Sequence, residues 1–208
     1  MKRYSLVILM VAYSLVCLSQ EENKHTIGLD ANYLYNARPK GIGIKDNFNY
    51  GFSLLITERI DKLRVGFGIN FSTFNYTRDQ NSAYKVVHKV KYLNFPLLFF
   101  FNNNSIRLVK ISPYGGIIVN KVIRYDQVIY NPDTATSYKN VEQIPINLGF
   151  TCRAGVNVSK PIGKHFMLNA APFADLKFVA NGYHSSGYDE LPDSFLTFGF
   201  RLGFDYLF

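Results

Sequence analysis

The chain ends in the segment LTFGFRLGFDYLF, residues 196–208, which decides the fold. Every second residue is large and apolar, so that one face of a strand carries Leu196, Phe198, Phe200, Leu202, Phe204, Tyr206 and Phe208. The other face carries small or polar residues, which are Thr197, Gly199, Arg201, Gly203 and Asp205. Because successive side chains of a strand point to opposite sides, we expect one face to lie against an apolar medium along its whole length.

The same period of two recurs along most of the chain. Clean alternation occurs in the segments 25–35, 48–57, 63–73, 148–158 and 166–178. Two further segments, 86–101 and 108–122, are less regular and contain Pro96 and Pro113. Proline inside a sheet belongs near an edge or a bulge, so the sequence leaves the faces of these two strands unassigned. Together with 196–208, these segments make eight predicted strands.

The predicted connections alternate in length. Three are short (59–62, 102–106 and 159–164), and four are longer and polar (36–47, 77–85, 124–143 and 180–193). Tight turns on one rim and long loops on the other are typical of transmembrane barrels, with the turns in the periplasm and the loops outside. The sequence therefore predicts an all-β fold, an eight-stranded antiparallel up-and-down transmembrane β-barrel.

A soluble eight-stranded barrel, such as a lipocalin-like binder, is the alternative. Its polar face would meet water and would be rich in Lys and Glu. Here the polar face is mostly Gly, Asn, Ser and Thr, which suits the crowded inside of a narrow barrel. The apolar faces carry Phe and Leu throughout, which eight strands are too few to enclose together. Both arguments favour the membrane barrel.

The first residues are typical of a cleavable signal peptide. Lys2 and Arg3 precede a short apolar run, 5–16, and small residues follow it before Gln20. We therefore expect a signal peptide at 1–19 and a barrel domain at 20–208, in the outer membrane of a Gram-negative bacterium. An uncleaved anchor is disfavoured because the apolar run is too short, and a lipoprotein using Cys17 is disfavoured because Val16 stands where a small residue is wanted. After cleavage Cys152 is the single cysteine, and no internal disulfide can form.

The chain carries a formal net charge of +8, and its basic residues are scattered. No Lys/Arg-rich run or recognition-helix pattern is present, so we expect no nucleic-acid partner. Loops that face anionic lipid headgroups account for the excess more simply.

Several motifs resemble the PorT-like outer-membrane barrel family. They are Tyr92-Leu93-Asn94-Phe95-Pro96-Leu97-Leu98, then Ser112-Pro113-Tyr114-Gly115-Gly116, the signal peptide and the Phe-terminated last strand. The resemblance covers the whole mature chain and implies a monomeric eight-stranded barrel. One branch of the family is tied to protein secretion. Family members commonly have an acidic residue where this chain has Asn94. The closing Tyr206-x-Phe208 resembles the terminal aromatic signal that the outer-membrane assembly machinery reads.

The predicted inner faces carry seven charged residues: Asp30, Arg64, Arg153, Asp175, Lys177, Arg201 and Asp205. The interior of an eight-stranded barrel is just filled by side chains, and charges there are costly unless they are paired. We therefore predict a structural ion-pair network, directly paired or bridged by water. A gated polar path is the alternative, which the narrow interior disfavours.

The remaining chemistry-bearing residues predict no enzyme, cofactor or metal site. The four histidines, His25, His88, His165 and His184, lack metal-ligand spacing. His184-Ser185-Ser186, with Asp189 and Glu190 nearby, invites comparison with barrel hydrolases, but its glycine- and serine-rich surroundings suggest a loop. Gly41-Ile42-Gly43 lacks the third glycine of a dinucleotide fingerprint.

Three functions stay open at this level. The first choice is an envelope structural or interaction protein acting through its extracellular loops, the longest of which holds Tyr125, Tyr130 and Tyr138. A component of a secretion or envelope-assembly system is second, on the resemblance alone. A narrow, porin-like pore is third. The expected partners are outer-membrane lipid, the assembly machinery during insertion, and proteins at the loops.

Overall fold

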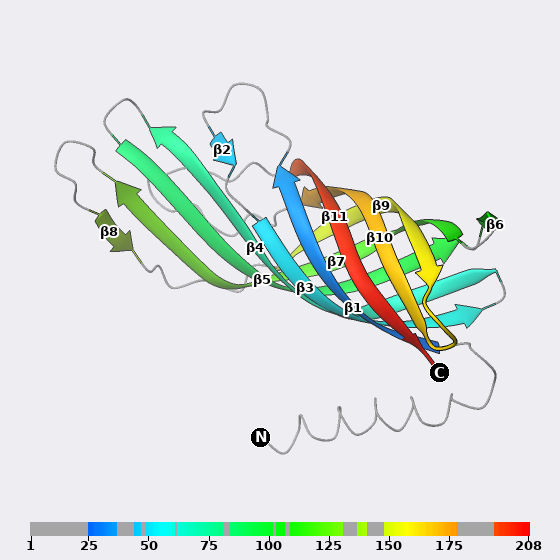
Figure 1. The fold of residues 1–208 in the computed structure, drawn as a ribbon. Helices are drawn as coiled ribbons and strands as arrows, with labels where there is room; N and C mark the ends of the chain where they lie inside the picture. Colours follow the sequence, from blue (N-terminus) through cyan, green and yellow to red (C-terminus); the bar gives the residue numbers. More distant parts are fainter. Residues whose placement is uncertain are drawn as a thin grey trace, which may run out of the picture.

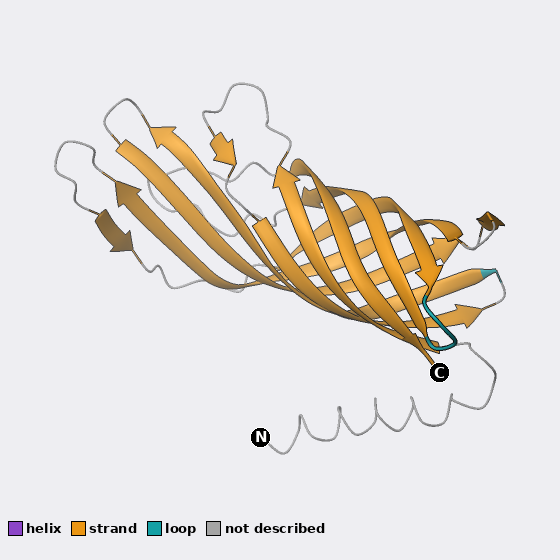
Figure 2. Ribbon diagram, viewed as in Figure 1, coloured by secondary structure: helices purple, strands orange, loops and turns teal. Residues whose placement is uncertain are grey.

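We describe the chain from a computed structural model. The structure describes residues 25–36, 44–46, 49–60, 62–80, 84–101, 103–106, 109–130, 137–140, 148–178 and 194–208. The expected signal peptide, Gly41-Ile42-Gly43 and His184-Ser185-Ser186 lie outside these residues. All elements within them are strands, as Figure 2 shows. Among the described residues, no helix is long and apolar enough to cross a membrane.

The strands have the following bounds. Eight are long: β1 (His25–Asn36), β3 (Asn49–Ile60), β4 (Leu63–Gln80), β5 (Tyr84–Phe101), β7 (Val109–Tyr130), β9 (Leu148–Pro161), β10 (Phe166–Phe178) and β11 (Ser194–Leu207). Three are short: β2 (Ile44–Asp46), β6 (Asn103–Ile106) and β8 (Ser137–Asn140).

The eight long strands form a closed antiparallel barrel. Each pairs with the next along the chain, and β11 pairs back onto β1 from Thr26↔Leu207 to Asn36↔Thr197. Figure 1 shows β11 and β1 side by side. Closure satisfies the backbone of every barrel strand without an open edge, which is what a sheet needs to cross a bilayer. The predicted architecture is confirmed.

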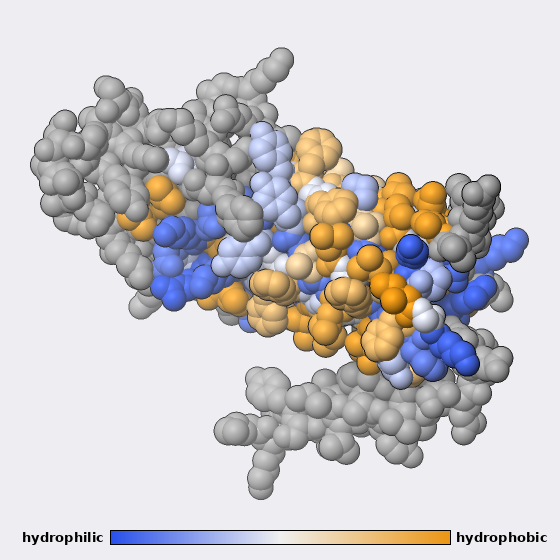
Figure 3. Space-filling view, viewed as in Figure 1, coloured by the Kyte–Doolittle hydropathy of each residue, from blue (hydrophilic) through white to orange (hydrophobic). Residues whose placement is uncertain are grey.

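The predicted alternation of β11 is confirmed by its burial. Leu202 and Phe204 are 51% and 58% exposed, whereas Arg201 and Asp205 are 4% and 7% exposed. Other strands carry large exposed apolar side chains in the same alternation, including Phe52, Phe71 and Phe150. On the face in view, Figure 3 shows apolar side chains gathered as a band over the middle of the barrel. In water such a surface would aggregate, so the band is the lipid-facing belt of a membrane protein.

The two rims differ. At one rim lie the connection between β3 and β4, the turn 162–165, and the described ends His25 and Phe208; we call it the short-turn rim. In the turn, Gly163 has a φ of +80°, a conformation that glycine adopts without strain. At the other rim β4, β5 and β7 continue past the barrel, with β2 paired to β4 and β8 to β7 (Figure 1). We call these five strands the projecting sheet.

Two of the predicted loops are wrong, because the strands of the projecting sheet run through them. The connections predicted at 77–85 and 124–143 are largely strand, because β4 runs to Gln80, β5 starts at Tyr84 and β7 runs to Tyr130. Paired residues include Thr77↔Val87 and Lys89↔Asp126. Outside the bilayer both faces of a strand can be polar, so the alternation fades although the backbone pairing continues.

The structure also shows which faces of the two proline-containing strands point into the barrel. Pro96 is buried and faces inward, whereas Pro113 is exposed and faces outward. The pairing of β4 with β5 passes directly from Phe67↔Leu97 to Asn70↔Asn94, because Pro96 has no N–H to donate there. A bulge at Ile123 shifts the register between β5 and β7, where the projecting sheet leaves the barrel.

Candidate functional site: the charged interior of the barrel

All seven of the predicted interior charges lie on the inward faces of their strands. Asp30, Asp175, Arg201 and Asp205 are buried, and Arg64, Arg153 and Lys177 are half-buried. The structure brings six of them into three ion pairs. The strands position them through their period of two, which keeps every second side chain on the same face.

Arg201 is the centre of this arrangement. One guanidinium nitrogen lies 3.6 Å from Oδ2 of Asp30 on β1, and Nη2 donates to Oδ1 of Asn157 on β9 at 3.1 Å. The guanidinium carbon lies 5.3 Å from the ring centre of Tyr114 on β7 and 5.7 Å from that of Phe100 on β5. The two rings stack with centres 5.1 Å apart. A single side chain of β11 therefore contacts four other strands.

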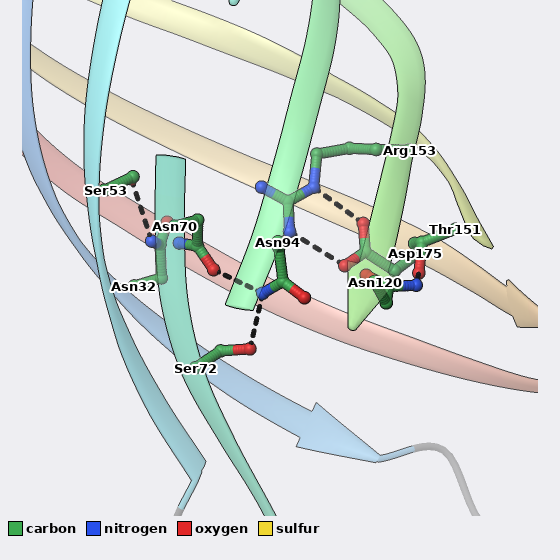
Figure 4. A network of polar contacts seen from close by, with 9 residues as sticks. All are labelled: Asn32, Ser53, Asn70, Ser72, Asn94, Asn120, Thr151, Arg153 and Asp175. Atoms are coloured by element: carbon green, nitrogen blue, oxygen red, sulfur yellow. Dashed lines mark hydrogen bonds and ion pairs between the residues drawn. The ribbon is translucent and has the colours of Figure 1, made fainter. Parts of the chain in front are cut away.

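Arg153 and Asp175 form the shortest of the three ion pairs. They lie opposite each other on β9 and β10, and Nε and Nη2 of Arg153 donate to the two carboxylate oxygens at 2.7 and 2.8 Å (Figure 4). The guanidinium carbon also lies 3.8 Å from the ring centre of Phe173. Two parallel hydrogen bonds fix both partners in orientation, which makes this the most rigid ion pair of the interior.

Arg64 and Asp205 connect strands that are not neighbours. Nη1 of Arg64 on β4 lies 3.7 Å from Oδ2 of Asp205 on β11, with β3 and β1 between the two strands. The Arg64 guanidinium carbon also lies 4.9 Å from the Phe100 ring centre. The pair thus crosses the interior, and side chains occupy that level of the barrel.

Lys177 lies nearer the projecting sheet than the three ion pairs. Its Nζ lies 5.1 Å from the ring centre of Phe74 and 5.6 Å from that of Tyr92. Phe74 and Val90 form a small buried cluster there, against which Tyr92, Val122 and Tyr125 pack. The cation is therefore held against aromatic faces, an arrangement that compensates for part of its lost hydration.

A set of amide and hydroxyl contacts surrounds the charges, and it was not predictable from the sequence. The amide nitrogen of Asn94 donates to Oδ1 of Asn70 at 2.7 Å and to Oγ of Ser72 at 2.8 Å. Asn120 donates to Oγ1 of Thr151 at 2.7 Å. Figure 4 shows these contacts reaching across neighbouring strands. The signal in the sequence was the recurrence of Asn, Ser and Thr at alternate positions, but period alone does not say which of them meet.

The interior also contains an apolar core. It is formed by Leu34, Leu55, Leu98, Phe100, Tyr114, Ala171 and Phe173, none more than 5% exposed. Glycines make room for it: a Cβ on Gly199 would overlap the Phe173 ring, and one on Gly203 would overlap the Asp30 carboxylate. Aromatic rings and ion pairs therefore fill the space between opposite strands, in the tight packing expected for eight strands.

Two histidines, His25 and His165, sit at the short-turn rim. Nδ1 of His165 lies 3.3 Å from the backbone oxygen of Leu207, and the His25 ring centre lies 5.9 Å from that of Phe208. Neither histidine is a member of the three interior ion pairs. Within the described ranges, no group of three or more His, Cys, Asp or Glu side chains could hold a metal ion.

Comparison with known proteins gives the fold. No protein-family model and no curated protein sequence matches the chain. Among solved structures, a major outer membrane protein from Thermus thermophilus is similar with a TM-score of 0.50 at 14% identity, covering 88% of this chain and 99% of that one. Neisserial surface protein A is similar with a TM-score of 0.47 at 12% identity, covering 91% and 100%.

OprG, an outer membrane protein from Pseudomonas aeruginosa, is similar with a TM-score of 0.42 at 15% identity, covering 90% of this chain and 97% of that one. The chain has the fold of the small outer-membrane β-barrels. This fold and the apolar belt together place it in the outer membrane of a Gram-negative bacterium.

Proposed function

We propose that the chain is an envelope structural or interaction protein, in which the barrel is an anchor and the projecting sheet with its loops meets partners outside the cell. One combination supports this: the interior is occupied by paired charges and aromatic rings, while β4, β5 and β7 continue beyond the barrel. Strand pairing that extends past the bilayer builds a surface that the membrane does not require. The proposal assigns no catalytic residue, cofactor or metal, and it takes the barrel as a monomer.

A conducting pore is disfavoured by the same interior. Arg201 contacts four other strands, and the Arg64–Asp205 pair crosses between non-neighbouring strands. We expect purified protein in planar bilayers to give no defined single-channel steps. Reproducible steps of one conductance, absent from a mock-purified control, would contradict the anchor and favour a pore.

The interaction role is tested by crosslinking from the projecting sheet. Val87 and Val128 pair with each other on β5 and β7, beyond the bulge. A photo-reactive amino acid at either position in intact cells should give a covalent adduct with another protein. The matched control is the exposed Lys160 at the short-turn rim, where no such adduct is expected. Equal adducts at both rims, or none at either valine, would contradict the proposal.

A secretion or envelope-assembly role is the second candidate, and it rests on the resemblance to the PorT-like family. The resembling segment 92–98 lies in β5, where Asn94, Pro96 and Leu98 are buried in the barrel. Three of the seven motif residues are thus used for interior packing in this chain. Affinity purification from native envelopes separates the two candidates, because co-purification of secretion or assembly components in stoichiometric amounts would favour the second.

A further inference from the structure

Basic residues gather at one place on the outward face of the barrel. On β5 the outward residues change from Phe95 and Leu93 to charged residues, and on β7 they change after Val119. Just beyond these points, four basic residues with described side chains are exposed; we call them the rim cluster: Lys89, Lys91, Lys121 and Arg124. They lie at the rim from which the projecting sheet extends. Figure 3 shows hydrophilic atoms between the apolar band and that end of the molecule.

The strand register holds the rim cluster together. Lys91 lies directly opposite Arg124 across β5 and β7, and Lys121 pairs with Leu93, the next outward residue of β5. The one carboxylate among them is Asp126, which pairs with Lys89 and accepts a hydrogen bond from Nε of Arg124 at 2.8 Å. Among the side chains described here, four cations thus face one anion. Like charges opposite each other destabilise a sheet unless a counter-anion lies between them.

The strands on either side of the rim cluster carry uncharged residues opposite it. The outward residue paired with Lys91 on β4 is Thr73, and the residue paired with Lys121 on β9 is Leu148. Thr73 in turn contacts the backbone of Tyr50 on β3. The neighbouring strands on both sides are therefore uncharged at these paired positions, so the four cations form one group on β5 and β7.

The surroundings indicate what kind of anion fits. Phe95 and Val119 are each 43% exposed. Toward the middle of the barrel, lipid-facing side chains therefore begin at the first or second outward-facing residue after the cations. A molecule that contacts both regions has an anionic head and apolar chains. The long stems of Lys and Arg can lie on the apolar belt while their charged ends reach the headgroup layer. Because the tight turns of such barrels face the periplasm, the rim cluster lies in the outer leaflet.

We propose that the rim cluster is a binding site for the phosphorylated headgroup of an outer-leaflet glycolipid, whose acyl chains lie along Leu93, Phe95 and Val119. Phosphate oxygens between Lys91 and Arg124 would neutralise the like-charged pair, and the guanidinium of Arg124 can bind phosphate through two parallel hydrogen bonds. The site differs from the protein-binding surface proposed above, which lies farther out on the same sheet, and does not depend on it.

The test uses the full chain in phosphatidylcholine nanodiscs doped with bisphosphorylated lipid A, with bound lipid measured by native mass spectrometry. The double variant Lys91→Gln/Arg124→Gln should bind about thirtyfold more weakly, as expected when two basic side chains leave a membrane surface. The double variant Lys110→Gln/Lys160→Gln, which alters exposed lysines near the short-turn rim, should bind like the wild type. The charge-preserving Lys91→Arg should also retain binding.

Two further ligands identify what is recognised. Dephosphorylated lipid A should bind no better than phosphatidylcholine, and the acyl-free phosphorylated disaccharide should bind weakly. Equal retention of dephosphorylated lipid, or unchanged binding by the Lys91→Gln/Arg124→Gln variant, would overturn the proposal. Equal affinity for the acyl-free disaccharide would replace the lipid site with a site for soluble phosphosugars. Unfolding temperatures of the variants, measured alongside, show that the barrel is intact.

Discussion

Replacing Arg201 by methionine should destabilise the barrel strongly. Methionine keeps much of the apolar stem, so that the change removes the charge and its contacts rather than opening a large cavity. Asp30 is 6% exposed and would lose the cation that lies 3.6 Å away, and Asn157 would lose the donor at 3.1 Å. Removing one partner of a buried ion pair costs about 3–5 kcal/mol. Because the free energy of unfolding falls by about 1–3 kcal/mol per molar urea, we expect the urea midpoint to fall by about 1–5 M.

The assay is urea unfolding of protein refolded into lipid vesicles, followed by the change in electrophoretic mobility between folded and unfolded barrel. The double variant Asp30→Asn/Arg201→Met removes both charges and should recover about 1–3 kcal/mol relative to Arg201→Met alone. Arg201→Met within about 0.5 kcal/mol of the wild type, the range of ordinary surface substitutions, would refute the network. Strictly additive effects of the two substitutions would show that the charges do not stabilise each other.

Three other predictions concern the two faces of the strands. Leu202→Arg, at a lipid-facing position in the middle of β11, should cost about 2–4 kcal/mol in vesicles, whereas Leu196→Arg near the rim should cost about 0–1 kcal/mol; equal costs would contradict the depth assigned to them. Cys152 is exposed on the outward face of β9, so with Cys17 replaced by serine it should not react in vesicles with a charged, membrane-impermeant maleimide and should react once the barrel is unfolded. Gly203→Val should reduce stability by about 1–3 kcal/mol, because its side chain would enter space held by a carboxylate of β1; a neutral effect in the unfolding assay would show that the interior is loosely packed.

The face of each charge was predictable from the sequence, whereas its partner was not. A period of two fixes which side of a strand a residue occupies, and a slip of one residue would invert the whole strand. Arg64 and Asp205 were therefore assignable to the interior before the structure. Their pairing depends on the stagger of strands that are not neighbours, and no local spacing in the sequence encodes that stagger.

The strands around the two prolines show where the period of two fails. In 95–101, FPLLFFF, both faces are apolar, because the inward Leu98 and Phe100 contribute to the interior core while the outward residues face lipid. An alternating pattern is visible only where one face is polar, so the sequence does not show which of these residues point inward. The extension of β7 was not predicted for the converse reason: Arg124 and Asp126 are polar residues at the level where the strand leaves the hydrocarbon core, so no apolar face marks it.

Arg201 and Lys91 carry the same charge in opposite environments. We expect the buried Arg201 to stabilise the fold and the exposed Lys91 to bind lipid. Arg201 is 4% exposed and contacts four other strands, so that its loss should appear in unfolding and leave lipid binding unchanged apart from folding. Lys91 is exposed opposite Arg124, and removing it also removes a like-charge contact, so that Lys91→Gln should leave stability near or slightly above the wild type while weakening lipid binding. A Lys91→Gln variant that loses both stability and binding would mean that the rim cluster supports the sheet rather than a ligand.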